Sequence, residues 1–180
     1  MSKVPNAQLV HIGLHCRDLE KMVDFYCRVF GLKVTDSGDY YMGGQITFLS
    51  RDAKEHHQVV LATGRTDDGS LKLINQISFR VDSLEDLIIF YHMLVEEKVK
   101  EMKPRNHGNA WSIYFHDPED NRIEIYTSTP WYVGQPFGQS LDLSSSADTI
   151  RAKTAEMVKT DSSHCPIEKW SDKLGALIKN

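Results

Sequence analysis

The stretch KLINQISFRVDSLEDL, residues 72–87, decides the fold because it repeats the beginning of the chain. The earlier copy is QLVHIGLHCRDLEKM, residues 8–22. An offset of 65 residues aligns the two copies and places Gln76 where the first copy has His11. The same offset carries the Phe-Tyr pair at 25–26 onto the pair at 90–91. An internal repeat of this period predicts a fold built from one supersecondary unit used twice.

Each copy reads as a strand followed by a helix. In the first copy Asp18 is a suitable N-cap, an apolar stripe follows at helical spacing, and Gly31 ends the helix. In the second copy Ser83 is the expected cap of a helix within residues 83–99. Further strands are expected near 34–41, 45–50, 57–62, 111–116 and 122–127.

The sequence therefore predicts an α+β fold of two βαβββ modules, at about residues 8–64 and 73–129. Alternation in the paired strands puts apolar side chains toward the helices and polar ones on the other face. In a single sheet that polar face would simply be exposed to solvent. Two modules brought together would curl their polar faces into a shared cup.

A C-terminal extension, residues 130–180, follows the repeat. It opens with a stretch rich in Pro, Gly and Ser, and two helices are expected at about 147–159 and 166–178. We expect it to pack on the domain or on a partner subunit, so a homo-oligomer is among the expected states.

Composition narrows the class of protein. The chain has 180 residues, 41% hydrophobic content and a net charge of −4, with no basic run to suggest nucleic acid. Its three cysteines have no CxxC spacing, which argues against a disulfide framework or a cysteine zinc site. The N-terminus lacks the apolar segment of a signal peptide, and no apolar run approaches membrane-spanning length. We expect a soluble, cytoplasmic protein.

The hairpin AWSIYFHDPEDNRIEIYT, residues 110–127, carries the first candidate chemical groups. Its DPEDN segment is a turn between two alternating strands, and centring the turn on Glu119 sets Tyr114 opposite Glu124 on one face. Considered alone, Glu124 is equally well explained as a solvent-side residue of an amphipathic strand.

The segment EHHQVVLA, residues 55–62, adds a histidine pair. The 65-residue offset sets Glu124 on Val59, so His57 is expected on the corresponding face. Alone, such a pair is more often a loop-edge feature. Together with His11 and Gln76, however, these positions all map to the inner faces of the two modules. His11 with Glu124, and a third group at the symmetric position 76, would form a facial site with open coordination positions. Two imidazoles and one carboxylate in that arrangement suit Fe(II).

These residues resemble the vicinal oxygen chelate superfamily, which includes glyoxalase I, the fosfomycin and bleomycin resistance proteins and the extradiol dioxygenases. The resemblance spans residues 9–129 and is strongest to type I extradiol ring-cleavage dioxygenases. Its marks are a histidine in the first strand, an HH pair whose second member lies 46 residues later, and a Tyr ten residues before a Glu. The segment YFHDPEDNRIEIY is similar to the signature YFxDPxGNRxE.

The resemblance implies a role for each matching residue. The metal ligands would be His11, Gln76 and Glu124, and His57 would be the acid–base group. Tyr114 would donate a hydrogen bond to a substrate oxygen. His107 would correspond to a further family histidine, although its spacing departs from the pattern. Trp131 and Tyr132 would wall the substrate pocket, unless they only pack the tail.

Gln76 departs from the family pattern, because the family has a histidine ligand at this position. Three interpretations remain open: Gln76 binds the metal through its amide oxygen, as a glutamine does in animal glyoxalase I; His11, Glu124 and water hold the metal; or the site has no metal. We favour ligation because the remaining residues of the pattern are intact.

The resemblance thus implies a metal-dependent dioxygenase that cleaves a catecholic ring with O₂. The expected metal is Fe(II), with Mn(II) or another divalent ion as the alternative, and the expected partners are a small aromatic diol and O₂. The competing hypotheses are a glyoxalase- or epimerase-like isomerase or lyase, and a non-catalytic small-molecule binding protein.

Overall fold

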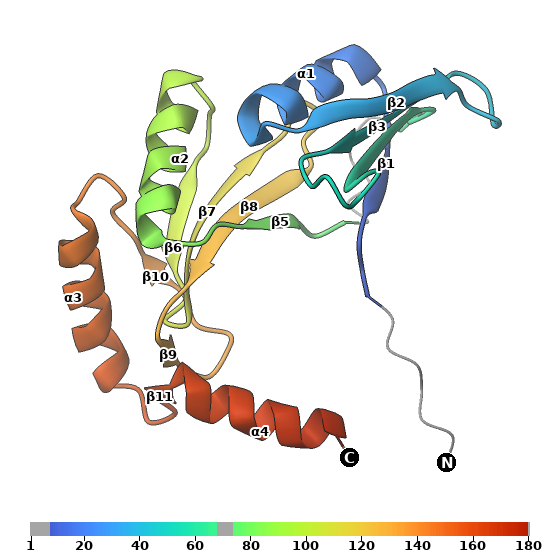
Figure 1. The fold of residues 1–180 in the computed structure, drawn as a ribbon. Coiled ribbons are helices and arrows are strands. Elements are labelled where there is room, and N and C mark those ends of the chain that lie inside the picture. Colours follow the sequence, from blue (N-terminus) through green and yellow to red (C-terminus); the bar gives the residue numbers. More distant parts are fainter. Residues whose placement is uncertain (1–7, 68–73, 180) are drawn as a thin grey trace. The chain divides into compact units, whose positions relative to one another are not determined.

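The computed structural model describes residues 8–67 and 74–179, and the chain divides into two compact units (Figure 1). Unit 1 comprises Met1–Leu73 and Asp117–Asp120, and unit 2 comprises Ile74–His116 and Asn121–Asn180. The division falls between the two repeats, except that the short segment 117–120 belongs to unit 1.

Unit 1 contains a four-stranded sheet in the order β1-β4-β3-β2. The first and last strands of the module pair in parallel and the others pair antiparallel. The helix packs on β3 and β4. In chain order the elements are β1 (Ile12–Cys16), α1 (Leu19–Phe30), β2 (Lys33–Asp39), β3 (Gln45–Ser50) and β4 (Val59–Thr63).

The ends and the buried face of α1 follow from its sequence. The Asp18 side chain accepts a hydrogen bond from the backbone N–H of Lys21 at 3.0 Å, and Gly31 ends the helix with a φ of 66°. Both expected end signals are confirmed. The buried side chains of the helix supply the core of this unit: Met22, Phe25, Tyr26, Val29 and Phe30.

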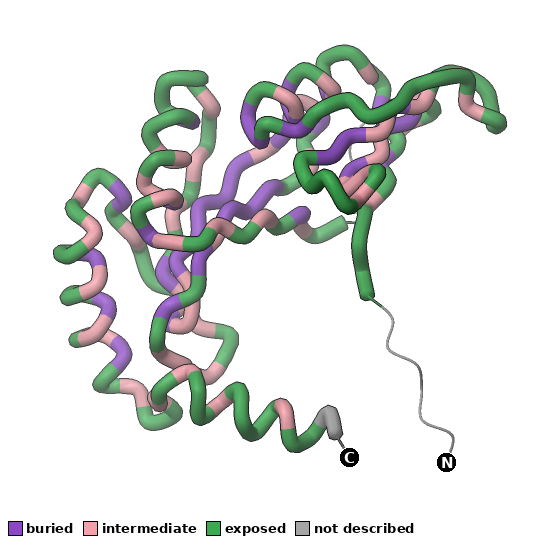
Figure 2. Tube along the Cα trace, viewed as in Figure 1, coloured by how far each residue is buried: buried purple, intermediate pink, exposed green. Residues whose placement is uncertain are grey.

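Unit 2 repeats the topology. Its five-stranded sheet has the order β10-β6-β7-β8-β5, with β5 parallel to β8, and α2 packs on β7 and β8. Burial is concentrated along β7 and β8 (Figure 2). The module elements are β5 (Ile77–Arg80), α2 (Leu84–Glu96), β6 (Lys103–Asn106), β7 (Ala110–His116) and β8 (Arg122–Ser128).

The expected α+β fold of two βαβββ modules with two further C-terminal helices is confirmed. That their polar faces close into one cup stays a prediction. The extension consists of β9 (Trp131–Tyr132), β10 (Gln139–Ser140), α3 (Ala147–Lys159), β11 (Cys165–Pro166) and α4 (Ile167–Lys179).

The extension is anchored through a buried polar contact. Thr154 of α3 is 1% exposed, and its hydroxyl accepts hydrogen bonds from Trp111 Nε1 and Asn106 Nδ2, each at 2.8 Å. Buried donors need such partners, so α3 is part of the unit 2 core. Within residues 8–67 and 74–179, no helix is both long enough and apolar enough to cross a membrane.

The segment 117–120 fixes one end of α1 in unit 1. Glu119 is 4% exposed and accepts hydrogen bonds from the backbone N–H groups of Arg17 and Asp18, at 2.5 and 2.8 Å. Arg65 Nη1 pairs with the same carboxylate at 3.4 Å. The Tyr26 hydroxyl donates to Asp117 at 3.2 Å. A buried carboxylate is stable here because cations and helix-terminal N–H groups surround it.

Candidate functional site

Three strands of unit 2 bring polar side chains to one face of the sheet. In the antiparallel β7–β8 pair, Tyr114 lies opposite Glu124, which confirms the expected hairpin register. In the parallel β5–β8 pair, Ser78 lies beside Glu124. Gln76 immediately precedes β5 and reaches the same carboxylate.

Glu124 is buried and accepts hydrogen bonds only from neutral groups of unit 2. The Tyr114 hydroxyl donates to Oε1 at 2.5 Å, while Ser78 Oγ and Gln76 Nε2 donate to Oε2 at 2.5 and 2.7 Å. None of the described lysines, arginines or histidines of unit 2 forms an ion pair with this carboxylate, which is 7% exposed. A buried carboxylate without a counter-charge is electrostatically unfavourable, and a cation would offset that cost.

His107 and Tyr114 extend the network away from Glu124. His107 Nε2 contacts the Tyr114 hydroxyl at 3.0 Å, and His107 Nδ1 contacts the Phe137 carbonyl at 2.7 Å. Because a carbonyl only accepts, Nδ1 carries a proton. Burial, and then the hydrogen bond to Glu124, raise the pKa of Tyr114 to about 12. The phenol therefore remains a proton donor across the whole neutral range.

A small pocket of about 290 Å³ opens beside this network. His107, Tyr114, Glu124, Tyr126 and Gln135 contribute to its wall. Its volume is close to the lower end of the range for small-molecule sites, so it suits a compact ligand. The pocket gives such a ligand access to both the phenol and the carboxylate.

The polar cluster of unit 1 consists of imidazoles, whereas that of unit 2 consists of hydrogen-bond donors around a carboxylate. The rings of His11 and His57 meet edge to face, with centroids 4.3 Å apart, and Nδ1 of His56 lies 2.9 Å from Nδ1 of His57. Burial lowers the pKa of His57, and the neighbouring His11 and His56 lower it further, against a smaller opposite effect of Glu55. His57 is consequently a neutral base at neutral pH.

One alignment expected from the sequence is wrong. Ile12 pairs with Val59 in unit 1, whereas Ile77 pairs with Ile123 in unit 2, so the equivalent of Glu124 is Val60 and not Val59. The 65-residue offset holds for the first strands and is one residue shorter for the last strands. His57 is therefore placed by its position just before β4 and its contact with His11, not by a strand face shared with Glu124.

The remaining candidate residues lie elsewhere in unit 2. Tyr132 stacks on Trp170 of α4, with centroids 5.3 Å apart and planes 13° from parallel. Trp131 meets Trp111 edge to face. Neither Trp131 nor Tyr132 lines the pocket beside Glu124. Ser78 was not among the candidate site residues, although it shares the strand face of Gln76 and so is open to identification by alternation.

The oxygen atoms of Glu124 and Gln76 in unit 2 are suitable ligands for a divalent cation. Glu124 supplies the uncompensated charge, and because Gln76 uses its N–H groups on Glu124 and Ser78, its amide oxygen is the atom left to face a cation. Among the described residues, no three histidine, cysteine, aspartate or glutamate side chains are grouped to hold a metal. The ligand set His11, Gln76 and Glu124 thus stays a prediction.

The chain is similar to several known proteins. It is 28% identical over 153 residues to biphenyl-2,3-diol 1,2-dioxygenase 2 of Rhodococcus globerulus, covering 75% of this chain and 77% of that protein. It is 23% identical over 121 residues to a probable lactoylglutathione lyase of Synechocystis, covering 65% and 92%.

Solved structures share the fold. A variant of the fosfomycin resistance protein FosX from Listeria monocytogenes, solved with Mn(II) and a dihydroxypropylphosphonic acid, has a TM-score of 0.55 at 24% identity, covering 69% of this chain and 95% of that chain. A glyoxylase/bleomycin resistance protein/dioxygenase domain from Frankia has a TM-score of 0.57 at 20% identity, covering 69% and 94%. Residues 8–125 match the family Glyoxalase/Bleomycin resistance protein/Dioxygenase superfamily, and the chain belongs to that superfamily.

Proposed function

We propose that this protein is a metal-dependent extradiol dioxygenase that cleaves the ring of a small catecholic substrate with O₂. The observation that carries the proposal is the Tyr114–Glu124 pair at the edge of a compact pocket, with His107 bonded to the same phenol. The similarity to a biphenyl-2,3-diol dioxygenase supports this substrate class.

In this proposal His11, Gln76 and Glu124 hold the metal, Fe(II) first and Mn(II) as the alternative. When bound, such a metal lowers the pKa of a coordinated phenol and passes electron density from the diol toward O₂. Glu124 is the only charged member of this ligand set, and the Ser78 hydroxyl fixes its orientation.

The protein's own groups manage the protons. His57, with its lowered pKa, is unprotonated at neutral pH and is ready to take a proton from the diol. Tyr114 keeps its proton, and by turning it from Glu124 toward the substrate it donates a hydrogen bond to a substrate oxygen on which negative charge develops. His107, held by the Phe137 carbonyl, orients that hydroxyl. In the overall reaction one ring C–C bond breaks and both atoms of O₂ enter the product.

The test is to load the protein with Fe(II) without air and to follow O₂ uptake with a panel of catechols. The expected result is uptake together with a yellow ring-fission product, both abolished in Glu124→Gln. The matched control is Glu119→Gln, which alters another buried glutamate and should keep the turnover of its folded fraction. Iron-replete protein that consumes no O₂ with any diol would overturn the proposal.

Gln76 favours a second candidate, an isomerase or lyase that stabilises an enediolate on a divalent metal without O₂. The similarity to a probable lactoylglutathione lyase supports it. Against it, the unit 1 equivalent of Glu124 is Val60, so that strand supplies no carboxylate base. Metal-dependent turnover under argon would select this candidate, and a chain that binds ligand but no metal would be a binding protein.

A further inference from the structure

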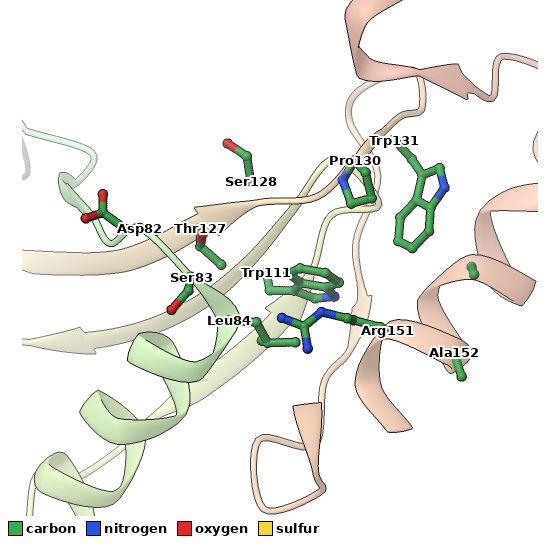
Figure 3. A pocket seen from close by; sticks show the side chains of 11 residues that line it. Asp82, Ser83, Leu84, Trp111, Thr127, Ser128, Pro130, Trp131, Arg151 and Ala152 are labelled. Carbon is green, nitrogen blue, oxygen red and sulfur yellow. The ribbon is translucent and has the colours of Figure 1, made fainter. Parts of the chain in front are cut away.

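A second pocket of about 580 Å³ lies in unit 2 between the start of α2, the end of β8 and α3 (Figure 3). We call it the tryptophan pocket; its principal lining residues are Leu84, Trp111, Thr127, Trp131, Arg151 and Ala155. It shares no lining residue with the pocket beside Glu124. Thr127 and Glu124 are three positions apart on β8, so they face opposite sides of the sheet.

Two indole rings form the wall of the tryptophan pocket. The rings of Trp111 and Trp131 stand nearly perpendicular, at 87°, with centroids 6.4 Å apart. Figure 3 shows both side chains beside Pro130, with Leu84 and Arg151 below Trp111. An aromatic ring packs well against such a corner, stacking on one indole and meeting the other edge to face. The volume is within the range of small-molecule sites.

One polar group in this wall has no partner. Thr127 is 3% exposed, and its hydroxyl forms no hydrogen bond with any residue in the described part of the chain. By contrast, the indole N–H of Trp111 is already bonded to Thr154. Because Thr127 lines the pocket, its hydroxyl can form a hydrogen bond with a ligand that supplies a donor or acceptor there.

The charges around the pocket argue for an uncharged ligand. Arg151 is occupied, because its Nη1 and Nη2 each donate to one oxygen of Glu85 at 2.7 Å, and Asp148 lies 3.7 Å from Nη1. Asp82 also lines the pocket. Two carboxylates thus pair with the guanidinium and a third, that of Asp82, lines the pocket, which disfavours an anion, while the guanidinium beside the rings disfavours a cation.

We propose that the tryptophan pocket binds a small uncharged aromatic molecule that carries one hydroxyl or carbonyl group. Its ring lies in the corner between Trp111 and Trp131, and its polar group bonds to the Thr127 hydroxyl. Several of the lining residues, Trp131, Arg151 and Ala155 among them, lie beyond the segment that matches the superfamily, residues 8–125. The site is therefore a property of this chain's extension.

The probe is benzyl alcohol, with benzoate and benzylamine as charged counterparts of similar size. The full chain is labelled with 5-fluorotryptophan, which gives one ¹⁹F resonance for each of the three tryptophans. Benzyl alcohol should shift the resonances of Trp111 and Trp131 saturably, with a Kd on the order of 1 mM, and should leave Trp170 unchanged. The charged probes should bind at least about tenfold more weakly.

Two variants, with Lys153→Phe as the control, locate the site. Ala155→Phe fills the pocket and should weaken binding more than about tenfold, whereas Lys153→Phe on the same helix should not. Thr127→Val, which preserves shape, should weaken benzyl alcohol about fivefold and leave toluene unchanged. No saturable shift, equal binding by Ala155→Phe and Lys153→Phe, or equal losses of alcohol and toluene in Thr127→Val would each overturn the proposal. None of these readouts depends on the dioxygenase activity.

Discussion

Unit 1 and unit 2 share the βαβββ topology, and each contains a buried glutamate, but the two glutamates have different partners. Glu119 of unit 1 meets Arg65 and two backbone N–H groups, so its charge is compensated. Among the described residues, Glu124 of unit 2 accepts hydrogen bonds from two hydroxyls and an amide and forms no ion pair. Both glutamates are buried, so burial alone does not identify a functional carboxylate. The informative feature is a buried charge whose protein partners are all neutral.

The polar clusters of the two modules also differ in the chemical groups that they contain. Unit 1 gathers three imidazoles near the starts of β1 and β4, where burial, and then the neighbouring His11 and His56, lower the pKa of His57. Unit 2 gathers donors around one anion. Duplication of the scaffold therefore supplies equivalent positions, while the chemistry at each position comes from local substitutions such as Val60 against Glu124.

The largest effect should come from removing the uncompensated charge. Glu124→Gln is expected to weaken Mn(II) or Fe(II) binding at least about 100-fold, because it removes the only anionic ligand of the proposed set. Isothermal titration calorimetry without air measures this change. Unchanged affinity would show that Glu124 is not a ligand.

Glu119→Gln is the opposite case. It should lower the free energy of unfolding by about 2 kcal/mol, since Arg65 and the N–H groups before α1 lose a charged partner. Urea denaturation measures the loss, and metal affinity of the folded protein should not change. A loss of metal affinity as large as that of Glu124→Gln would show that the two glutamates do not differ in this respect.

Gln76→His tests the departure from the family pattern. An imidazole binds Fe(II) better than a neutral amide oxygen, so the affinity should rise about tenfold. The same change removes a donor to Glu124, so the melting temperature without metal should fall by a few degrees. An unchanged affinity would place the metal, if bound, out of reach of residue 76.

Tyr114 provides a pH test. Its pKa is raised to about 12 from the ordinary value near 10, so the folded state binds the proton more tightly. The stability that this provides is fully present below pH 10 and is lost as the pH rises toward 12. Tyr114→Phe should flatten that part of the stability curve by roughly 1 kcal/mol, measured by denaturation at pH 9 and pH 11. An identical slope in the variant would contradict the raised pKa.

The smallest effects concern His57. Removing a neighbouring imidazole should raise its pKa, and His11→Gln should raise it more than His56→Gln. NMR titration of the imidazole carbons in metal-free protein measures both shifts. The reverse order would show that His56, not His11, controls this base.

Local signals were sufficient for much of the fold. Asp18, Gly31 and Ser83 mark helix ends through short-range hydrogen bonds and backbone preference, and all three were identified from sequence. The DPEDN turn fixed the Tyr114–Glu124 pairing because hairpin register depends on the turn. By contrast β6 was missed, since its four residues include Pro104 and lack a clear alternation.

Features set by distant packing could not be predicted. The one-residue difference in register between the two modules depends on loop conformation, which the repeat does not encode. The spacing of His107 departed from the family pattern, yet the chain brings it to Tyr114. The tryptophan pocket needs α3 to dock through Thr154, a contact 43 residues from Trp111 in the sequence.

The place of the segment 117–120 has a consequence for dividing the chain. A cut at residues 73–74 would separate the repeats in sequence, but it would leave unit 1 without Asp117 and Glu119. Tyr26 and Arg65 would then lose buried partners. The first repeat expressed alone is therefore expected to be less stable than in the full chain, because these buried groups lose their partners.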